Sequence, residues 1–453
     1  MSILHHTCVR KTVPKSHPLF GKVIYVPAMA EGSAQAFCAV LRGMGIEAHT
    51  TPPSDERTLE LGGKYTSGDE CYPAKVTVGD FVKITQQPGF DAKRTIFFMA
   101  SGEGPCRFGQ YATFLKKLLI DLGHAEVGVL SPSNEHGYSE IGEFGTPFVR
   151  GAWRALVSSD LLRKKLLKTR PYERKPGAAD RAFQDSVDDL CRTIEQGCSN
   201  FDCQMEALVD SLERTRGRFE CVEVEETQER PLIGVVGEIF CRLNTFSNSD
   251  LVRRLEKQGA ECWISDIAEW VTYTNEEEAR LLRLEGRIFS RAMLKCVLRT
   301  RIQRQDEHAL LEVFQDDFAG YEEPSYAELM DLARPYLPNT GIGGEMVMSV
   351  GKAGYLARKG ADGVVDISPF TCMNGIVSEA IYPRLSQDLG GFPIRNFYFD
   401  GTQSDLERDV GIYLELARSY REKKTQGREE LRRARRTAVP PEAQLQSALT
   451  EKH

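Results

Sequence analysis

The chain has 453 residues, which is enough for two or three domains, and its 41% hydrophobic and 27% charged residues are typical of a soluble globular protein. A net charge of −7 argues against a general nucleic-acid binder, and no apolar run is long enough to span a membrane. The amino-terminal stretch lacks the apolar segment of a signal peptide. We therefore expect a cytoplasmic protein whose twelve cysteines serve metal ligation or catalysis rather than disulfides.

Residues 1–149 alternate strand and helix patterns and are predicted to form an N-terminal α/β domain. Short apolar runs predict strands at 21–29, 47–51, 94–101 and 126–133. Helical patterns lie at 34–45 and from Cys106 to about Gly123. This alternation indicates a mainly parallel sheet with helices on both faces.

Residues 150–229 carry long helical patterns and few strand signals, so we interpret them as a helical connector that holds two sheet domains at a fixed distance. The α/β alternation returns over residues 230–422, with a mostly helical insertion at 275–335. Predicted strands of this C-terminal domain lie at 230–240, 261–265, 362–370 and 392–401, and its predicted helices at 250–260, 346–360 and 405–420. The charged tail, residues 423–453, resembles a fraying helix that passes into disorder. The predicted fold is therefore two Rossmann-like parallel-sheet domains joined by a helical connector.

Three cysteines share one local pattern, in which a loop cysteine stands one or two residues before an amphipathic helix. They are Cys71, Cys106 and Cys372, in the segments GDECYPAKVTVGDF, ASGEGPCRFGQYATFLKKLL and ISPFTCMNGIVSEAIYPRL. A helix start offers unpaired N–H groups and a positive dipole end, which favour a thiolate. Because thiolates bind iron–sulfur clusters and soft metals, the pattern predicts a cluster held between helix ends. The alternative is that all three are buried structural cysteines.

Cys241 is the fourth candidate, since it ends the predicted strand 230–240 on the carboxyl side, where ligands bind in open α/β sheets. It either completes a four-thiolate set or fills space beside the site. Three acids lie close in sequence to the candidate ligands or to strand ends, and their default role is to cap a helix or to face solvent: Glu70, Glu103 and Glu238.

The sequence offers no nucleotide-binding motif. It contains no GxxxxGK[ST] pattern, and TGIGGE at 340–345 is a glycine cluster without a clean preceding strand. If the chemistry requires ATP, the ATPase is therefore expected to be another chain.

Several separated motifs together resemble the acyl-CoA dehydratase activase-related family, which belongs to the 2-hydroxyacyl-CoA dehydratase and benzoyl-CoA reductase group. The motifs are GDECYPAKVTVGDF, GEGPCRFGQY, GEIFCRLNTFSNSDLVRRLEKQGAECW, WVTYTN and DISPFTCMNGIVSEAI, and the match covers most of residues 20–422. The resemblance implies that Cys71, Cys106 and Cys372 hold a [4Fe-4S] cluster in the cleft between two α/β domains. A double-cubane cluster is the alternative, although six ligands are hard to assemble here. The chain departs from the family at three positions. The family commonly has an aliphatic residue at the position of Cys241 and proline at the positions of Thr245 and Asn374.

The same resemblance carries expectations about function. Three-thiolate ligation leaves one iron open, which acts as a Lewis acid and delivers one electron, either for radical dehydration of an acyl-CoA or for reduction of a small molecule. The implied partner is an ATP-dependent activase as electron donor, and relatives often pair subunits. Two alternatives stay open, namely a non-catalytic electron-transfer or scaffold subunit and a metal-free interaction protein.

Overall fold

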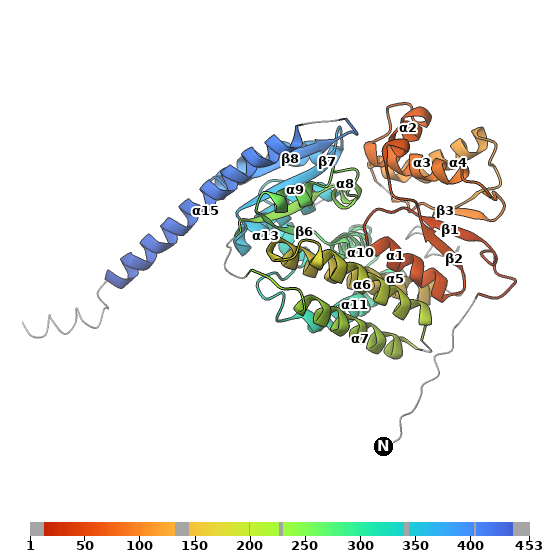
Figure 1. The fold of residues 1–453 in the computed structure, drawn as a ribbon, viewed down its shortest axis with the longest axis horizontal. Coiled ribbons are helices and arrows are strands. Elements are labelled where there is room, and N and C mark those ends of the chain that lie inside the picture. Colours follow the sequence, from red (N-terminus) through yellow and green to blue (C-terminus); the bar gives the residue numbers. More distant parts are fainter. Residues whose placement is uncertain are drawn as a thin grey trace, which may run out of the picture.

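Two four-stranded sheets, both parallel throughout, form the framework of the protein (Figure 1). The structure is a computed structural model and describes residues 13–102, 104–131, 145–198, 200–225, 230–338, 344–402 and 405–437. Helices connect successive strands, as parallel pairing requires. The predicted α/β architecture with two Rossmann-like domains is thus confirmed.

The first sheet has the strand order β2-β1-β3-β4. Its strands are β1 (Val23–Val26), β2 (Glu47–Thr50), β3 (Thr95–Phe98) and β4 (Gly128–Leu130). Its helices are α1 (Ser33–Gly43), α2 (Glu56–Tyr65), α3 (Tyr72–Thr85), the 3₁₀ helix η1 (Arg107–Gln110) and α4 (Tyr111–Asp121).

The second sheet repeats this arrangement with the order β6-β5-β7-β8. Its strands are β5 (Leu232–Gly237), β6 (Glu261–Ile264), β7 (Gly363–Pro369) and β8 (Ile394–Phe399). Its helices are α8 (Ile239–Leu243), α9 (Leu251–Lys257), α13 (Glu345–Lys359), α14 (Met373–Asp388) and α15 (Leu406–Thr437). Every residue of β7 is buried, as expected for a central parallel strand covered on both faces. In each sheet the second strand in sequence lies on one side of the first strand, and the third lies on the other side. This change of direction is a topological switch point, where open α/β sheets bind ligands.

Helices fill the two stretches for which the sequence predicts them. The connector contains α5 (Gly145–Thr169), the 3₁₀ helix η3 (Arg170–Tyr172), α6 (Ala178–Gln196) and α7 (Phe201–Glu220). The insertion in the second domain contains α10 (Ile267–Leu284), α11 (Arg291–Leu311), the 3₁₀ helix η4 (Glu312–Phe314) and α12 (Tyr326–Ala333). One hydrophobic core runs from α1 through α5, α6 and α7 to α11. The buried Arg154 of α5 also pairs with Asp306 of α11 at 2.8 Å. The connector is therefore packed against both halves of the protein.

A second core cluster forms where the carboxyl ends of the two sheets meet. Ala30 follows β1 and Tyr72 begins α3, and both pack with Phe240 of α8 and Phe399 of β8. The side-chain amide of Asn244 donates to the carbonyl oxygen of Ala28 at 3.0 Å, which adds a polar link between the domains. Figure 1 accordingly shows α8 beside the α2–α3 region. This packing brings the two ligand-binding edges toward each other.

Three local features differ from the sequence-based expectations or extend them. The loop predicted before Cys71 is short, since α2 extends to Tyr65 and packs closely on α3. The strand predicted at 230–240 ends at Gly237, and α8 begins two residues later. Helix α15 continues to Thr437 and so covers the first part of the predicted tail. Three sets of residues named in the sequence analysis lie outside the described residues: 438–453, Glu103 and most of the TGIGGE segment. Among the described helices, none is long and apolar enough to cross a lipid bilayer.

The close approach of α2 and α3 supports a stability prediction at Gly79. A Cβ atom at this position would lie 2.0 Å from the carbonyl oxygen of Thr58. We expect Gly79→Ala to lower the free energy of unfolding by about 1–3 kcal/mol, since the two backbones must separate. The exposed Gly63 of α2 has open space around it, so Gly63→Ala should instead stabilise by about 0.5–1 kcal/mol. Urea unfolding of both variants checks the prediction, which equal effects of the two substitutions would contradict.

Candidate metal centre

The three cysteines that share a sequence pattern also share a structural position. Cys71, Cys106 and Cys372 are the N-cap residues of α3, η1 and α14, all with extended backbone. None of the three side chains caps its helix with a hydrogen bond. N–H groups of a helix start therefore lie close to each of the three sulfurs. Cys106 is exposed, and Cys71 and Cys372 are half-buried.

Cys106 and Cys372 occupy equivalent places in the two domains. Cys106 follows β3 and Cys372 follows β7, and these are the third strands of two sheets with the same order. The turn before Cys372 is strained, because Thr371 adopts a φ of 64° although it is β-branched. Such strain costs on the order of 1–3 kcal/mol and is concentrated at functional sites. Both cysteines thus follow the carboxyl ends of their strands, where open α/β sheets bind ligands.

Electrostatic interactions link the sulfurs of the two domains. Burial raises the pKa of the Cys71 thiol, and the charges of Glu238 and Cys106 raise it further. Burial raises the pKa of the Cys241 thiol well above its ordinary value. The charges of Glu238, Cys372 and Cys71 raise this pKa further. These interactions relate Cys71 to Cys106 within the first domain, and they relate Cys241 of the second domain to both Cys71 and Cys372.

The thiol pKa values differ from the expectation that helix starts favour thiolates. Burial raises the pKa of Cys372 to about 12 and also raises that of Cys106, and Glu238 adds to both shifts. Backbone N–H groups of the helix starts act in the opposite direction but do not outweigh burial. A cation at this site must therefore displace protons from thiols.

Tyr111 is a site residue that the sequence did not single out. Its hydroxyl forms a short hydrogen bond with the Cys71 sulfur. This contact ties the start of α4 to the start of α3, next to Cys106. The only signal in the sequence is its place five residues after Cys106, which also suits an ordinary core aromatic.

Cys241 differs from the other three cysteines in its local structure. It lies inside α8 and is fully buried, whereas the sequence placed it at a strand end. The carboxylate of Glu238 caps α8 by accepting from the N–H groups of Phe240 at 3.1 Å and Cys241 at 2.7 Å. The default prediction that Glu238 is a helix cap is therefore confirmed, and this cap creates the helix that holds Cys241.

Two further buried carboxyl groups lie behind the cysteines and were not identified from the sequence. Glu345 at the start of α13 accepts from the N–H of Ile239 at 3.0 Å. Burial and then the charge of Glu238 raise the pKa of Glu345 to about 8. Asp366 in β7 accepts from the hydroxyls of Tyr382 at 2.6 Å and Ser368 at 2.7 Å. This side of the site is therefore acidic and internally hydrogen-bonded.

The residues beside the helix starts have mainly structural contacts. The Glu70 carboxylate accepts from the N–H groups of Ser67 and Gly68, and Arg107 donates to the carbonyl oxygen of Asp69 at 2.5 Å. Gly375 allows α14 to approach β7, because a Cβ there would lie 2.6 Å from that of Ser368. These contacts hold the loops of Cys71 and Cys372 in place.

The donor atoms at the four candidate positions are all cysteine sulfurs, the ligand type of iron–sulfur clusters. Among the described residues, no three His, Cys, Asp or Glu side chains lie close enough to hold one metal ion. In a cubane each thiolate binds a different iron, so its ligands stand farther apart than those of one ion. Three helix-start cysteines drawn from both domains offer the thiolate donors that such a cluster takes.

No protein family model matches this chain, and no curated protein matches its sequence.

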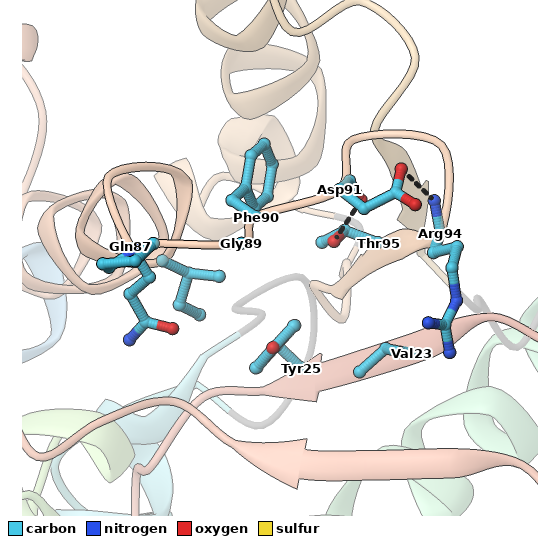
Figure 2. A pocket seen from close by; sticks show the side chains of 10 residues that line it. Val23, Tyr25, Gln87, Gly89, Phe90, Asp91, Arg94 and Thr95 are labelled. Atoms are coloured by element: carbon cyan, nitrogen blue, oxygen red, sulfur yellow. Dashed lines mark hydrogen bonds between the residues drawn. The ribbon is translucent and has the colours of Figure 1, made fainter.

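A separate cavity of about 140 Å³ lies at the opposite, amino-terminal edge of the first sheet (Figure 2). Val23 and Thr95, the first residues of β1 and β3, line it together with Phe90, Asp91 and Arg94. The Asp91 carboxylate accepts from the backbone N–H groups of Lys93 and Arg94, and the Thr95 hydroxyl donates to the Asp91 carbonyl oxygen at 2.8 Å. The polar groups of this cavity thus stabilise a turn, away from the cysteines.

Proposed function

We propose that this chain is an iron–sulfur protein of the 2-hydroxyacyl-CoA dehydratase and benzoyl-CoA reductase type. In this proposal Cys71, Cys106 and Cys372 hold a [4Fe-4S] cluster between the two α/β domains. When bound, the cluster would supply low-potential electron transfer and an open iron for an acyl-CoA or another small molecule.

One observation carries the proposal. Three cysteines distant in sequence each end a loop as an uncapped N-cap residue, and each precedes a helix on the carboxyl side of its sheet, which supports a shared site at the meeting edges. The electrostatic interactions of Cys71 with Cys106 and Cys241, and of Cys241 with Cys372, support this convergence.

Other side chains of the site position these ligands. The Tyr111 hydroxyl shares a hydrogen bond with the Cys71 sulfur, and with a thiolate it would be the donor and balance the negative charge. Glu238 orders α8 through its two backbone contacts, and Asn244 connects the same segment to the loop after β1. Because the sequence contains no GxxxxGK[ST] motif, the electron donor in this proposal is a separate ATP-dependent activase.

Anaerobic purification of the full chain followed by iron and acid-labile sulfide analysis tests the proposal. We expect about four iron and four sulfide per chain, as the cluster composition requires. Electron paramagnetic resonance of the reduced protein should change when a substrate acyl-CoA is added, since an open iron senses its ligand. A colourless protein without iron would refute the proposal.

The buried position of Cys241 favours one alternative within the same class. Its sulfur interacts with those of Cys71 and Cys372, and a fourth thiolate would leave no iron open. The chain would then be an electron-transfer or scaffold subunit without its own substrate. An unchanged resonance spectrum across a panel of acyl-CoAs, with full iron content, would favour this alternative.

A further inference from the structure

The most concentrated exposed apolar surface of the described chain lies at the α10–α11 hairpin. Seven large apolar side chains within 18 consecutive residues are at least half exposed, and Phe289 is fully exposed. We call them the hairpin patch: Leu281, Leu284, Ile288, Phe289, Leu294, Val297 and Leu298. At on the order of 100 Å² each, they reach or exceed the roughly 300–600 Å² of the largest apolar patch on a typical monomer.

The hairpin beneath this patch is well packed. Ala279 and Leu282 of α10 and Met293 and Cys296 of α11 form a small buried core between the helices. Ion pairs connect Arg304 with Glu276 at 2.7 Å and Arg299 with Glu278. Because the inner faces of both helices are already satisfied by each other, the apolar side chains outside them have no role in holding the hairpin together.

The charge around the patch is positive, in contrast to the net charge of −7 of the whole chain. Four exposed basic side chains lie within or beside it and form no ion pair with any residue that the structure describes: Arg283, Arg291, Lys295 and Arg301. Glu285 is the one acid between residues 281 and 301, and it is already paired with Arg287 at 3.0 Å. The patch thus combines an apolar centre with unneutralised positive charge.

We propose that the hairpin patch docks an acidic amphipathic helix of a partner protein. Leu294, Val297, Leu298 and Arg301 recur at helical spacing along α11 and make a stripe roughly 10 Å long, which a partner helix of two to three turns would cover. Carboxylates flanking the apolar face of that helix would pair with the free arginines and the lysine.

Two other occupants fit less well. A second copy of this chain would bring the same positive charges against each other if the patch paired with itself. A lipid bilayer would bury the apolar turn at Ile288 and Phe289. The stripe, however, runs away from this turn along α11, so insertion of the turn alone would leave the stripe exposed to water.

Two fluorescein-labelled helical peptides test the proposal on the full-length protein. Both carry leucines at helical spacing, flanked by glutamates in one peptide and by lysines in the other. We expect fluorescence anisotropy to show at least about tenfold tighter binding of the glutamate peptide, with an affinity that falls as salt is raised. The paired variants Leu294→Ser with Leu298→Ser, and Lys295→Glu with Arg301→Glu, should each weaken binding by about tenfold or more.

Matched controls separate a specific site from general stickiness. Ile412 and Leu416 of α15 are similarly exposed, so Ile412→Ser with Leu416→Ser should leave peptide binding unchanged. Unaltered circular dichroism will show that the variants are folded. Equal binding of the two peptides, no binding of either, or equal effects of patch and control variants would overturn the proposal.

Two further measurements address the competing occupants. Binding of phosphatidylserine-containing vesicles that the patch variants abolish, without peptide binding, would assign the patch to a membrane surface instead. A dimer in light scattering that the same variants convert to a monomer would assign it to self-association. Neither result would bear on the iron–sulfur proposal, which depends on other residues.

Discussion

Replacing Cys372 by serine is expected to lower the iron and sulfide content of anaerobically purified protein to less than about a third of the wild-type value, because the two remaining thiolates cannot hold a cubane. The same result is expected for Cys71→Ser and Cys106→Ser. The three substitutions act at one site although the residues are distant in sequence, since each cysteine is an N-cap residue at the meeting edges of the sheets. Iron, acid-labile sulfide and the absorbance of the brown protein measure the effect.

Cys221 provides the matched control, because it is an exposed free cysteine at the end of α7. Cys221→Ser should retain the full cluster content. Cys241→Ala should also retain iron, since this side chain lies inside α8 rather than at a helix start. Loss of iron in Cys241→Ala with retention in Cys372→Ser would contradict the three-cysteine ligand set and require a different one.

The element order was predictable because it depends on local composition. Apolar, β-branched runs such as those around Ile24 and Val365 form buried parallel strands, and the helices between them are required by parallel pairing. The helix-start positions of the three candidate ligands were predictable for a related reason. A cysteine at a helix start is a local pattern, and the carboxyl edge of a parallel sheet follows from strand direction.

The features that were missed depend on distant contacts. Helix α8 has only five residues and exists because Glu238 caps it and because Phe240 packs against the first domain. Tyr111 and Glu345 join the site through contacts with Cys71 and Ile239, which are 40 and 106 residues away in sequence. Residues of this kind carry no local signature, so neither composition nor spacing can assign them to a site.

A network of buried charges stabilises the second domain away from the cysteines. Lys352 of α13 is fully buried and donates to Glu269 of α10 at 2.5 Å and to Glu323. Lys164 of the connector also donates to Glu323, at 2.5 Å. Burial lowers the pKa of Lys352, but the two carboxylates outweigh this effect and hold its pKa above the ordinary value. Two ammonium groups thus face two carboxylates, and Lys352 contacts both carboxylates.

Replacing Lys352 by methionine is expected to lower the free energy of unfolding by about 3–5 kcal/mol. The substitution leaves the Glu269 carboxylate without its cation and removes one of the two lysines that face Glu323. Methionine has nearly the same length, so the loss reflects charge rather than packing. Lys359→Met is the matched control on the same helix. Its ion pair with Glu322 is largely exposed, and its loss should cost less than about 1 kcal/mol. Urea unfolding at pH 7 gives both values.

The pH dependence of this effect supplies an independent check. Burial raises the pKa of Glu323, but Lys164 and Lys352 outweigh it and hold that pKa at about 2, below the ordinary value of 4.5. Because the folded-state pKa is the lower one, this group stabilises the protein above pH 4.5, and its contribution is lost as the pH falls toward 2. The stability difference between wild type and Lys352→Met should therefore shrink between pH 5 and about pH 3. A stability difference that stays constant over this range would show that Lys352 contributes through packing alone. A second test adds Glu269→Gln to Lys352→Met. If the double variant regains stability, the unpaired carboxylate causes the loss.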